Sequence, residues 1–186
     1  MAKRIAILGW GSLLREDGGD FDRWRDEWRF DGPCVKIEFS RISKTRLGAL
    51  TLVVDIEDGV TNTVAWCMSK RKSAQDAVAD LGAEKVLKST RYEAWFPAIR
   101  FPMMTAKTIA VWATSKKLDV VVWTGLPSNF SKKLNQPVSL EAAVAYLKRL
   151  PLDGKLKAAE YIWRAPDFVT TPLRAAMQVE PWFGQD

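Results

Sequence analysis

The sequence predicts an α+β domain in which helices flank a mixed, largely antiparallel sheet. Six or seven β-rich runs occur along the chain, several of them follow one another in its middle, and helical patterns lie on either side. The chain has 186 residues and a mass of 21.0 kDa, and 47% of its residues are apolar, which is enough for one ample hydrophobic core. We therefore expect residues 1–186 to form a single domain.

The first element is an apolar run, residues 5–14, whose composition predicts a buried strand that breaks into a tight loop. Glycine permits positive φ and lets a ligand approach the backbone closely, so Gly9 and Gly11 would leave amide groups available for an anion or a carbonyl oxygen. Ser12 adds a hydroxyl at the same place. An ordinary strand followed by a turn fits the pattern equally well. A dinucleotide-binding loop requires a third glycine where this chain has Leu14, which argues against that interpretation.

The next stretch predicts one short helix and three strands. Residues 20–28 carry Phe21, Trp24 and Trp28 at spacings of three and four, as an amphipathic helix would. Three β-rich runs follow, at residues 34–42, 50–55 and 60–68. The Asp58-Gly59 pair between the last two is typical of a hairpin turn, so we expect these two runs to be neighbouring antiparallel strands.

A helix is expected to begin after Ser73, because an acidic residue follows three positions later, as in a capping box. Its apolar stripe passes through Leu81. If the helix continues past Gly82, Glu84 lies along this stripe, although Lys85 competes for the inward position. If Gly82 ends the helix, Glu84 lies in a loop.

The second half of the chain contains both β-rich runs and helical patterns. The expected strands are residues 91–96, 108–114 and 118–123, and an irregular loop rich in Gly, Pro and Asn follows at residues 124–130. Three helices are expected after this loop: one capped by Ser139 that continues through Leu150, one from Lys155 to Arg164, and one that begins at Thr171-Pro172.

The composition excludes several kinds of chemistry. The chain contains no histidine, which excludes Ser/His and Cys/His nucleophile pairs and most zinc sites. Cys34 and Cys67 lie in apolar, strand-like segments and are not spaced as a ligand pair, so we expect two reduced, buried thiols. We expect no metal site and no cofactor, and a carboxylate is the first candidate for any catalysis.

Charge and hydropathy limit where the protein is expected to reside and what it is expected to bind. No apolar run approaches the ~18 residues that cross a bilayer, so we expect a soluble, cytoplasmic protein without a membrane partner. The net charge is +6, but 22 acidic residues are interspersed with the basic ones, and most of the nine tryptophans lie in apolar runs. We therefore expect a surface that favours small anionic ligands and do not expect a nucleic-acid partner. The oligomeric state is left open by the sequence.

Three segments resemble the γ-glutamylcyclotransferase-like superfamily. Residues 8–14, Leu-Gly-Trp-Gly-Ser-Leu-Leu, are similar to the loop YGS(N/L)L that opens this family, with Trp10 where the family usually has tyrosine. Residues 64–68 resemble the later V-G-V-x-W/Y strand, and residues 80–84 resemble the L-x-x-x-E segment after it. The resemblance covers about the first half of the chain, and it implies a small, partly closed barrel.

The resemblance also implies an activity. Members of this superfamily cleave γ-glutamyl amides: the substrate's own α-amine attacks its γ-carbonyl, which releases 5-oxoproline and an amine. Glu84 matches the family's glutamate and would be the acid and base of this reaction. The loop would hold the γ-glutamyl group, and the residues concerned are Gly9, Trp10, Gly11, Ser12 and Leu13.

Two alternatives remain beside this interpretation. Trp10 in place of tyrosine removes a hydroxyl from the pocket, so the identity of the substrate is not determined by the resemblance. The first alternative is a non-catalytic module that binds a metabolite or a partner on the same fold. A nucleotide-dependent oxidoreductase would require a parallel sheet and a helix that starts at the glycine loop.

Overall fold

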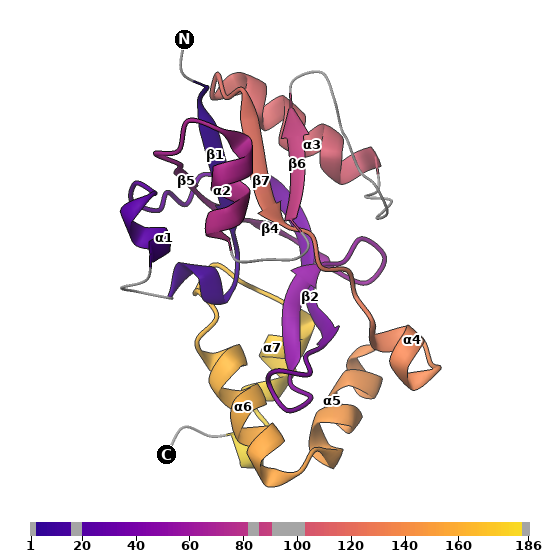
Figure 1. Cartoon of the computed structure of the whole chain (residues 1–186). Helices are drawn as coiled ribbons and strands as arrows, with labels where there is room; N and C mark the ends of the chain where they lie inside the picture. Colours follow the sequence, from indigo (N-terminus) through magenta and orange to yellow (C-terminus); the bar gives the residue numbers. More distant parts are fainter. Residues whose placement is uncertain (1–2, 16–19, 82–85, 91–102, 184–186) are drawn as a thin grey trace. The chain divides into compact units, whose positions relative to one another are not determined.

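The computed structural model describes residues 3–15, 20–81, 86–90 and 103–183 (Figure 1). Contacts between residues divide the chain into two compact units. One comprises residues 1–35 and 63–126, and the other comprises residues 36–62 and 127–186. Each unit is therefore assembled from two separate stretches of the chain, and both contain helices and strands, which confirms the predicted α+β class.

The first unit contains a mixed four-stranded sheet in the order β5-β1-β7-β6. In this sheet β1 runs parallel to β7 and antiparallel to β5, with Leu8 opposite Trp66, and β6 runs antiparallel to β7. All five residues of β1 are buried, which explains the uninterrupted apolar run in its sequence. The bounds are β1 Ile5–Gly9, β5 Ala65–Met68, β6 Val86–Thr90 and β7 Val120–Thr124.

Helix α2 lies against β1 and β7 in the same unit (Figure 1). Its apolar side packs on a buried cluster, which we call the β1 cluster: Ile5, Ile7, Cys67, Ala77, Val120 and Val122. The Ser73 hydroxyl accepts a hydrogen bond from the Asp76 amide at 3.1 Å, which confirms the predicted N-cap. The helices of this unit are η1 Ser12–Leu14, α1 Asp20–Arg23, α2 Ala74–Asp80 and α3 Met103–Ser115.

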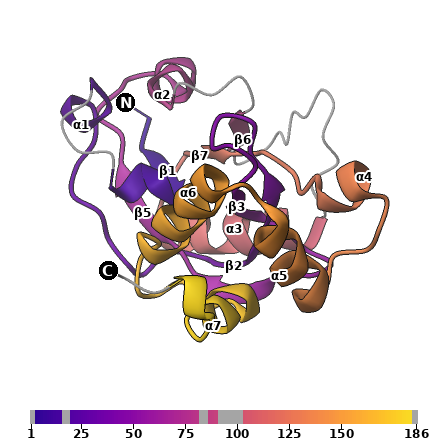
Figure 2. The same cartoon turned by 90° about the horizontal axis from the view of Figure 1, so that it is seen from below.

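The second unit contains most of a three-stranded sheet in the order β3-β2-β4, together with the C-terminal helices. In it α5 lies beside α6 and α7, as Figure 2 shows, and α6 contacts β3. The strands are β2 Cys34–Ile42, β3 Leu50–Val54 and β4 Val60–Thr63, and the helices are α4 Phe130–Leu134, α5 Leu140–Arg149, α6 Leu152–Trp163, α7 Pro172–Met177 and η2 Pro181–Phe183.

Two more predicted helix starts are confirmed in this unit. The Ser139 hydroxyl accepts from the Ala142 amide at 3.1 Å at the start of α5. The Thr171 hydroxyl accepts from the Arg174 amide at 3.3 Å at the start of α7, which has Pro172 in its first turn.

The predicted hairpin between residues 50–55 and 60–68 is wrong. Strand β2 lies between β3 and β4, so these two strands are not neighbours. The second run is also divided into β4 and β5, which belong to different sheets. The chain does turn at Gly59, whose amide donates to the Asp55 carbonyl at 3.0 Å. The local turn signal was therefore correct, but it did not determine the partner strand.

Three other expectations need correction. Residues 108–114 lie within α3 and are not a strand, and Ile109 and Ala113, four residues apart, are both buried. The helix expected over residues 20–28 ends at Arg23 in α1. Cys34 is exposed rather than buried, whereas Cys67 is buried as expected.

The strands of the described residues pair as two separate sheets, without closure into one barrel. The strand expected at residues 91–96 lies outside the described residues. Among the helices in the described part of the chain, none is long and apolar enough to cross a membrane.

Candidate functional site

The loop predicted to hold a ligand follows β1 directly. Strand β1 ends at Gly9, and Gly11 is the N-cap residue of the short helix η1, which begins at Ser12. The Gly11 carbonyl accepts from the Leu14 amide at 3.2 Å, and the Ser12 carbonyl accepts from the Arg15 amide at 2.9 Å. Among the backbone hydrogen bonds of the described loops and turns, none has the amide of Gly11 or Leu13 as its donor. We therefore take these two amides as candidate donors to a ligand.

The sequence suggested two reasons for the glycines of this loop, a positive φ and the close approach of a ligand to the backbone. Neither Gly9 nor Gly11 has a positive φ, so the first reason is wrong. Gly11 has a φ of −134°. At Gly9 the packing is close, because a Cβ there would lie 2.8 Å from both Leu14 Cδ1 and Trp28 Cη2, so these side chains would have to move. Gly9 is thus needed for close contact within the protein, whatever the loop binds.

The apolar side chains of the loop contribute to the core. The side chain of Trp10 is almost wholly buried, with 4% of its surface exposed. Leu13 is half-buried and packs against the β1 cluster. A ligand at this loop would therefore meet backbone amides, with the hydroxyl of Ser12 as the polar side chain beside them.

Glu84, the predicted acid and base, lies outside the described residues. The described chain reaches Leu81, three positions before it, and Leu81 packs against the same β1 cluster as Leu13. The segment that leads to Glu84 and the predicted binding loop thus share one patch of hydrophobic core.

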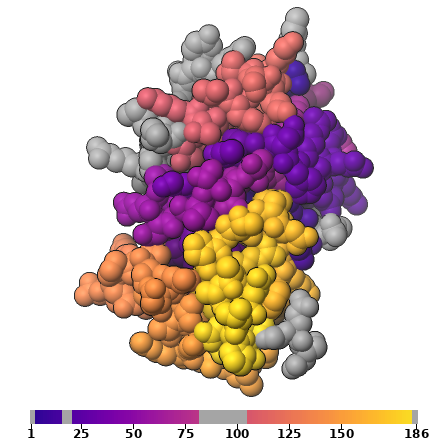
Figure 3. All heavy atoms as spheres, turned by 180° about the vertical axis from the view of Figure 1, so that it is seen from behind, coloured from indigo at the N-terminus to yellow at the C-terminus, as the bar shows by residue number. Residues whose placement is uncertain are grey.

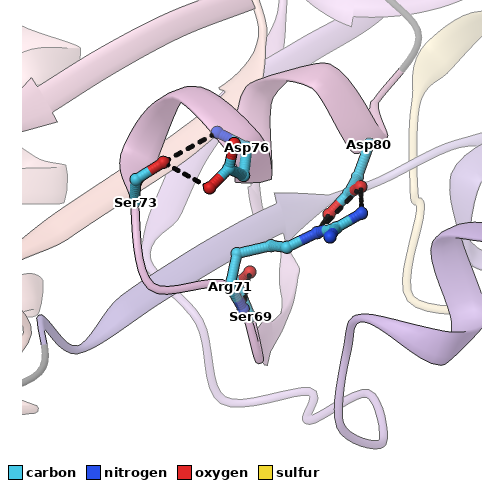
Figure 4. Close-up of polar contacts among 5 residues, drawn as sticks. All are labelled: Ser69, Arg71, Ser73, Asp76 and Asp80. Carbon is cyan, nitrogen blue, oxygen red and sulfur yellow. Dashed lines mark hydrogen bonds and ion pairs between the residues drawn. The ribbon is translucent and has the colours of Figure 1, made fainter.

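An ion pair fixes the end of α2 that leads toward Glu84 (Figure 4). Arg71 donates from Nε to Asp80 Oδ2 at 2.8 Å and from Nη2 to Asp80 Oδ1 at 2.6 Å. The backbone amide of Arg71 donates to Ser69 Oγ at 3.1 Å, and its guanidinium lies 3.5 Å from the ring centre of Trp24. Because the two-pronged geometry restricts the side chain of Asp80, it holds the last turn of α2 against the segment that connects β5 to this helix.

The second unit contains buried carboxylates that the sequence did not reveal as a group. Glu38 on β2 and Asp55 after β3 are each only 6% exposed. Burial raises the pKa of Glu38, and the nearby charge of Asp55 adds to this, whereas hydrogen bonds from Phe39, Thr171 and Leu173 act in the opposite direction. Sequence alternation places Glu38 on the face opposite Ile37 and Phe39, which would suggest solvent, but both faces of β2 are buried here.

No protein-family model matches the chain, and no curated protein or solved structure matches it significantly. The described residues also contain no group of three or more Cys, Asp or Glu side chains that could hold a metal ion. The sheet beside this loop is mixed, since β1 is parallel to β7 but antiparallel to β5, and the helix after the loop has only three residues; a dinucleotide-binding fold has a parallel sheet and a full helix at this place.

Proposed function

We propose that the protein cleaves a γ-glutamyl amide by intramolecular cyclisation. In this reaction the α-amine nitrogen of the substrate forms a bond with its γ-carbonyl carbon, and the amide bond to the leaving nitrogen breaks. Two protons leave the α-ammonium group: one is transferred to the leaving nitrogen as its bond to the γ-carbon breaks, and the other ends on the released amine, which departs as an ammonium ion. The products are 5-oxoproline and a free amine, and no water enters the reaction.

The proposal assigns two tasks to the protein. Amides of the loop after β1 would donate to the γ-carbonyl oxygen as negative charge develops on it. Glu84 would accept a proton from the α-ammonium group and return one to the leaving nitrogen. Bending the γ-glutamyl group for ring closure brings the two reacting atoms together, which supplies much of the acceleration in such reactions.

The observation that carries the proposal is the shared packing of Leu13 and Leu81 on the β1 cluster. Leu13 belongs to the binding loop, and Leu81 is the last described residue before Glu84. The amides of Gly11 and Leu13 would supply the donors that the reaction requires. The net charge of +6 further favours a substrate that carries a carboxylate.

The family resemblance supports the proposal through the loop and the strand that follows it. Residues 64–68, which resemble the family's later strand, include β5, and β5 pairs with β1 beside the loop, where Gly9 lies opposite Ala65. The resemblance also implies a small, partly closed barrel, whereas the described strands pair as two separate sheets. The proposed reaction does not depend on such closure, since it requires only that the loop and Glu84 face one substrate.

The test is turnover of γ-glutamyl amides by the full chain, followed as release of 5-oxoproline. Glu84→Gln keeps the size of the side chain but cannot carry the proton, so turnover should fall by about 10²–10⁴ while the substrate affinity is largely kept. Glu93→Gln is the matched control and should leave turnover within about threefold of the wild-type value.

Two results would overturn this assignment. Normal turnover in Glu84→Gln together with an inactive Glu93→Gln would move the acid and base to the other carboxylate. Binding of a γ-glutamyl compound without any release of 5-oxoproline by the wild type would identify a binding module instead of an enzyme.

A further inference from the structure

The second unit contains a cavity of about 160 Å³ that the proposed reaction does not use. Its walls come from β2, the turn before β4, and the first turns of α5 and α7. Figure 3 shows the α5 region in orange and the α7 region in yellow side by side on this unit. The lining residues are Glu38, Phe39, Asp58, Val138, Ser139, Leu140, Ala143, Pro172 and Leu173.

Glu38 is the buried polar group of this cavity. One of its oxygens accepts from the Phe39 amide at 2.6 Å, and the carboxylate also receives hydrogen bonds from the Thr171 hydroxyl and the Leu173 amide. An ionised carboxylate can accept about four hydrogen bonds. Three donors from the protein therefore leave about one acceptor position of Glu38 available.

Asp58 is a second carboxylate that lines the cavity, and it is hydrogen bonded to a third, Asp55, which does not line it. Asp58 is exposed and therefore lies at the rim. Its amide donates to Asp55 Oδ1 at 3.2 Å, and Asp55 in turn accepts from the Ser40 hydroxyl at 2.5 Å. The described lining residues include no lysine or arginine. The negative charge of this group is thus not balanced by a cation in the cavity wall.

The other walls of the cavity are mainly apolar. Val138, Leu140, Ala143 and Pro172 present hydrocarbon surface, and the Ser139 hydroxyl already caps α5 through the Ala142 amide. A metal ion of the Ca²⁺ or Mg²⁺ type needs six or more oxygen ligands, which this wall does not offer. A ligand that fits must combine one cationic hydrogen-bond donor with an apolar body.

We propose that this cavity binds a small primary ammonium ion with a short aliphatic chain. The ammonium group lies between Glu38 and Asp58 and donates to both carboxylates. The chain lies against Val138, Leu140 and Ala143. At roughly 30 Å³ for each water-sized group, the cavity accommodates about five non-hydrogen atoms, which is the size of butylammonium. This site is independent of the proposed cyclisation.

The electrostatic effects on these carboxylates support a cationic occupant. Burial, followed by the charges of Asp55 and Glu57, raises the pKa of Asp58, as burial does for Glu38. A bound ammonium ion would oppose these effects by placing a positive charge between the two carboxylates.

The experiment titrates the isotope-labelled full chain with n-butylammonium chloride at constant ionic strength and follows the backbone amide signals by NMR. We expect saturable, millimolar binding that shifts the amides of Phe39, Ala143 and Leu173. Equal concentrations of 1-butanol and of butyrate should leave these amides unshifted, because the first lacks the charge and the second carries the wrong sign.

Three variants locate the site and one serves as a control. Glu38→Gln should weaken binding at least tenfold, provided that its spectrum shows a folded chain. Asp58→Asn, at an exposed position, should weaken binding about three- to fivefold. Leu140→Trp should abolish binding by filling the cavity from its partly exposed edge. Glu57→Gln removes the neighbouring charge, which does not line the cavity, and should change the affinity less than twofold.

Four outcomes would each overturn the proposal. They are the absence of saturable binding up to 100 mM, equal shifts with 1-butanol, competition by millimolar Ca²⁺ at the same amides, and equal weakening in Asp58→Asn and Glu57→Gln. None of these outcomes bears on the release of 5-oxoproline.

Discussion

The ion pair between Arg71 and Asp80 should contribute far more to stability than an ordinary surface pair. The side chain of Asp80 is 6% exposed and that of Arg71 is 27% exposed. Breaking a fully buried pair costs about 3–5 kcal/mol, because a charge is left without its partner, whereas exposed pairs contribute about 0–1 kcal/mol. With one buried and one partly exposed member, we expect Arg71→Met to lower the free energy of unfolding by about 2–3 kcal/mol.

A double-mutant cycle separates the pair from the other contacts of Arg71, which include its stacking on Trp24. Urea unfolding of Arg71→Met, Asp80→Asn and the double variant should give a coupling energy of about 1–2 kcal/mol. The control cycle uses the exposed pair Lys157–Glu160, whose side chains are 53% and 40% exposed, and should give at most about 0.5 kcal/mol. A coupling no larger than that of the control would refute the claim that this pair anchors α2.

Three further predictions follow from burial and backbone geometry. Cys67 is buried and its pKa is raised to about 12, so iodoacetamide at pH 8 should label Cys34 in the native protein and Cys67 only after unfolding; rapid native labelling of Cys67 would contradict its burial. Burial raises the pKa of Glu38 above its ordinary value of 4.5, so ionising this side chain destabilises the folded state. The free energy of unfolding of the wild type, measured by urea titration, should therefore fall relative to that of Glu38→Gln as the pH rises from about 4 to 7. If the two proteins show the same dependence of this free energy on pH, the prediction is wrong. Gly11 has a negative φ, so Gly11→Val should fold, yet its bulk beside the loop amides should raise KM for a γ-glutamyl amide at least tenfold; an unchanged KM would remove this loop from the site.

The elements that the sequence predicted correctly are those with local hydrogen-bond signals. Ser73, Ser139 and Thr171 each cap a helix through an amide three residues later, and this contact depends on the neighbouring residues alone. The apolar run of β1 was equally clear, because all five of its residues are buried and a strand covered on both faces reads as a continuous apolar run.

The errors concern contacts between distant parts of the chain. A turn at Gly59 is visible in the sequence, but the insertion of β2 between β3 and β4 is a matter of pairing across the sheet. Residues 108–114 form an apolar, β-branched run that fits a buried helix as well as a strand, and only the packing of α3 distinguishes the two.

The two candidate sites, the loop after β1 and the cavity around Glu38, also differ in whether neighbouring or distant residues form them. The loop after β1 was found because glycines beside a buried strand form a compact local pattern. The environment of Glu38 was missed, since the hydroxyl of Thr171 and the amide of Leu173, which hydrogen bond its carboxylate, come from a helix more than 130 residues later in the chain. Burial of that kind becomes visible only when the fold is known.

The most direct test of the proposed function is the origin of the oxygen atoms in the product. When the full chain converts a γ-glutamyl amide in water enriched in oxygen-18, intramolecular cyclisation should release 5-oxoproline and the amine in equal amounts. The 5-oxoproline should contain no oxygen-18, because its ring carbonyl keeps the oxygen of the original amide. Release of glutamate with one oxygen-18 atom in its γ-carboxylate would show hydrolysis by water instead and would contradict the account.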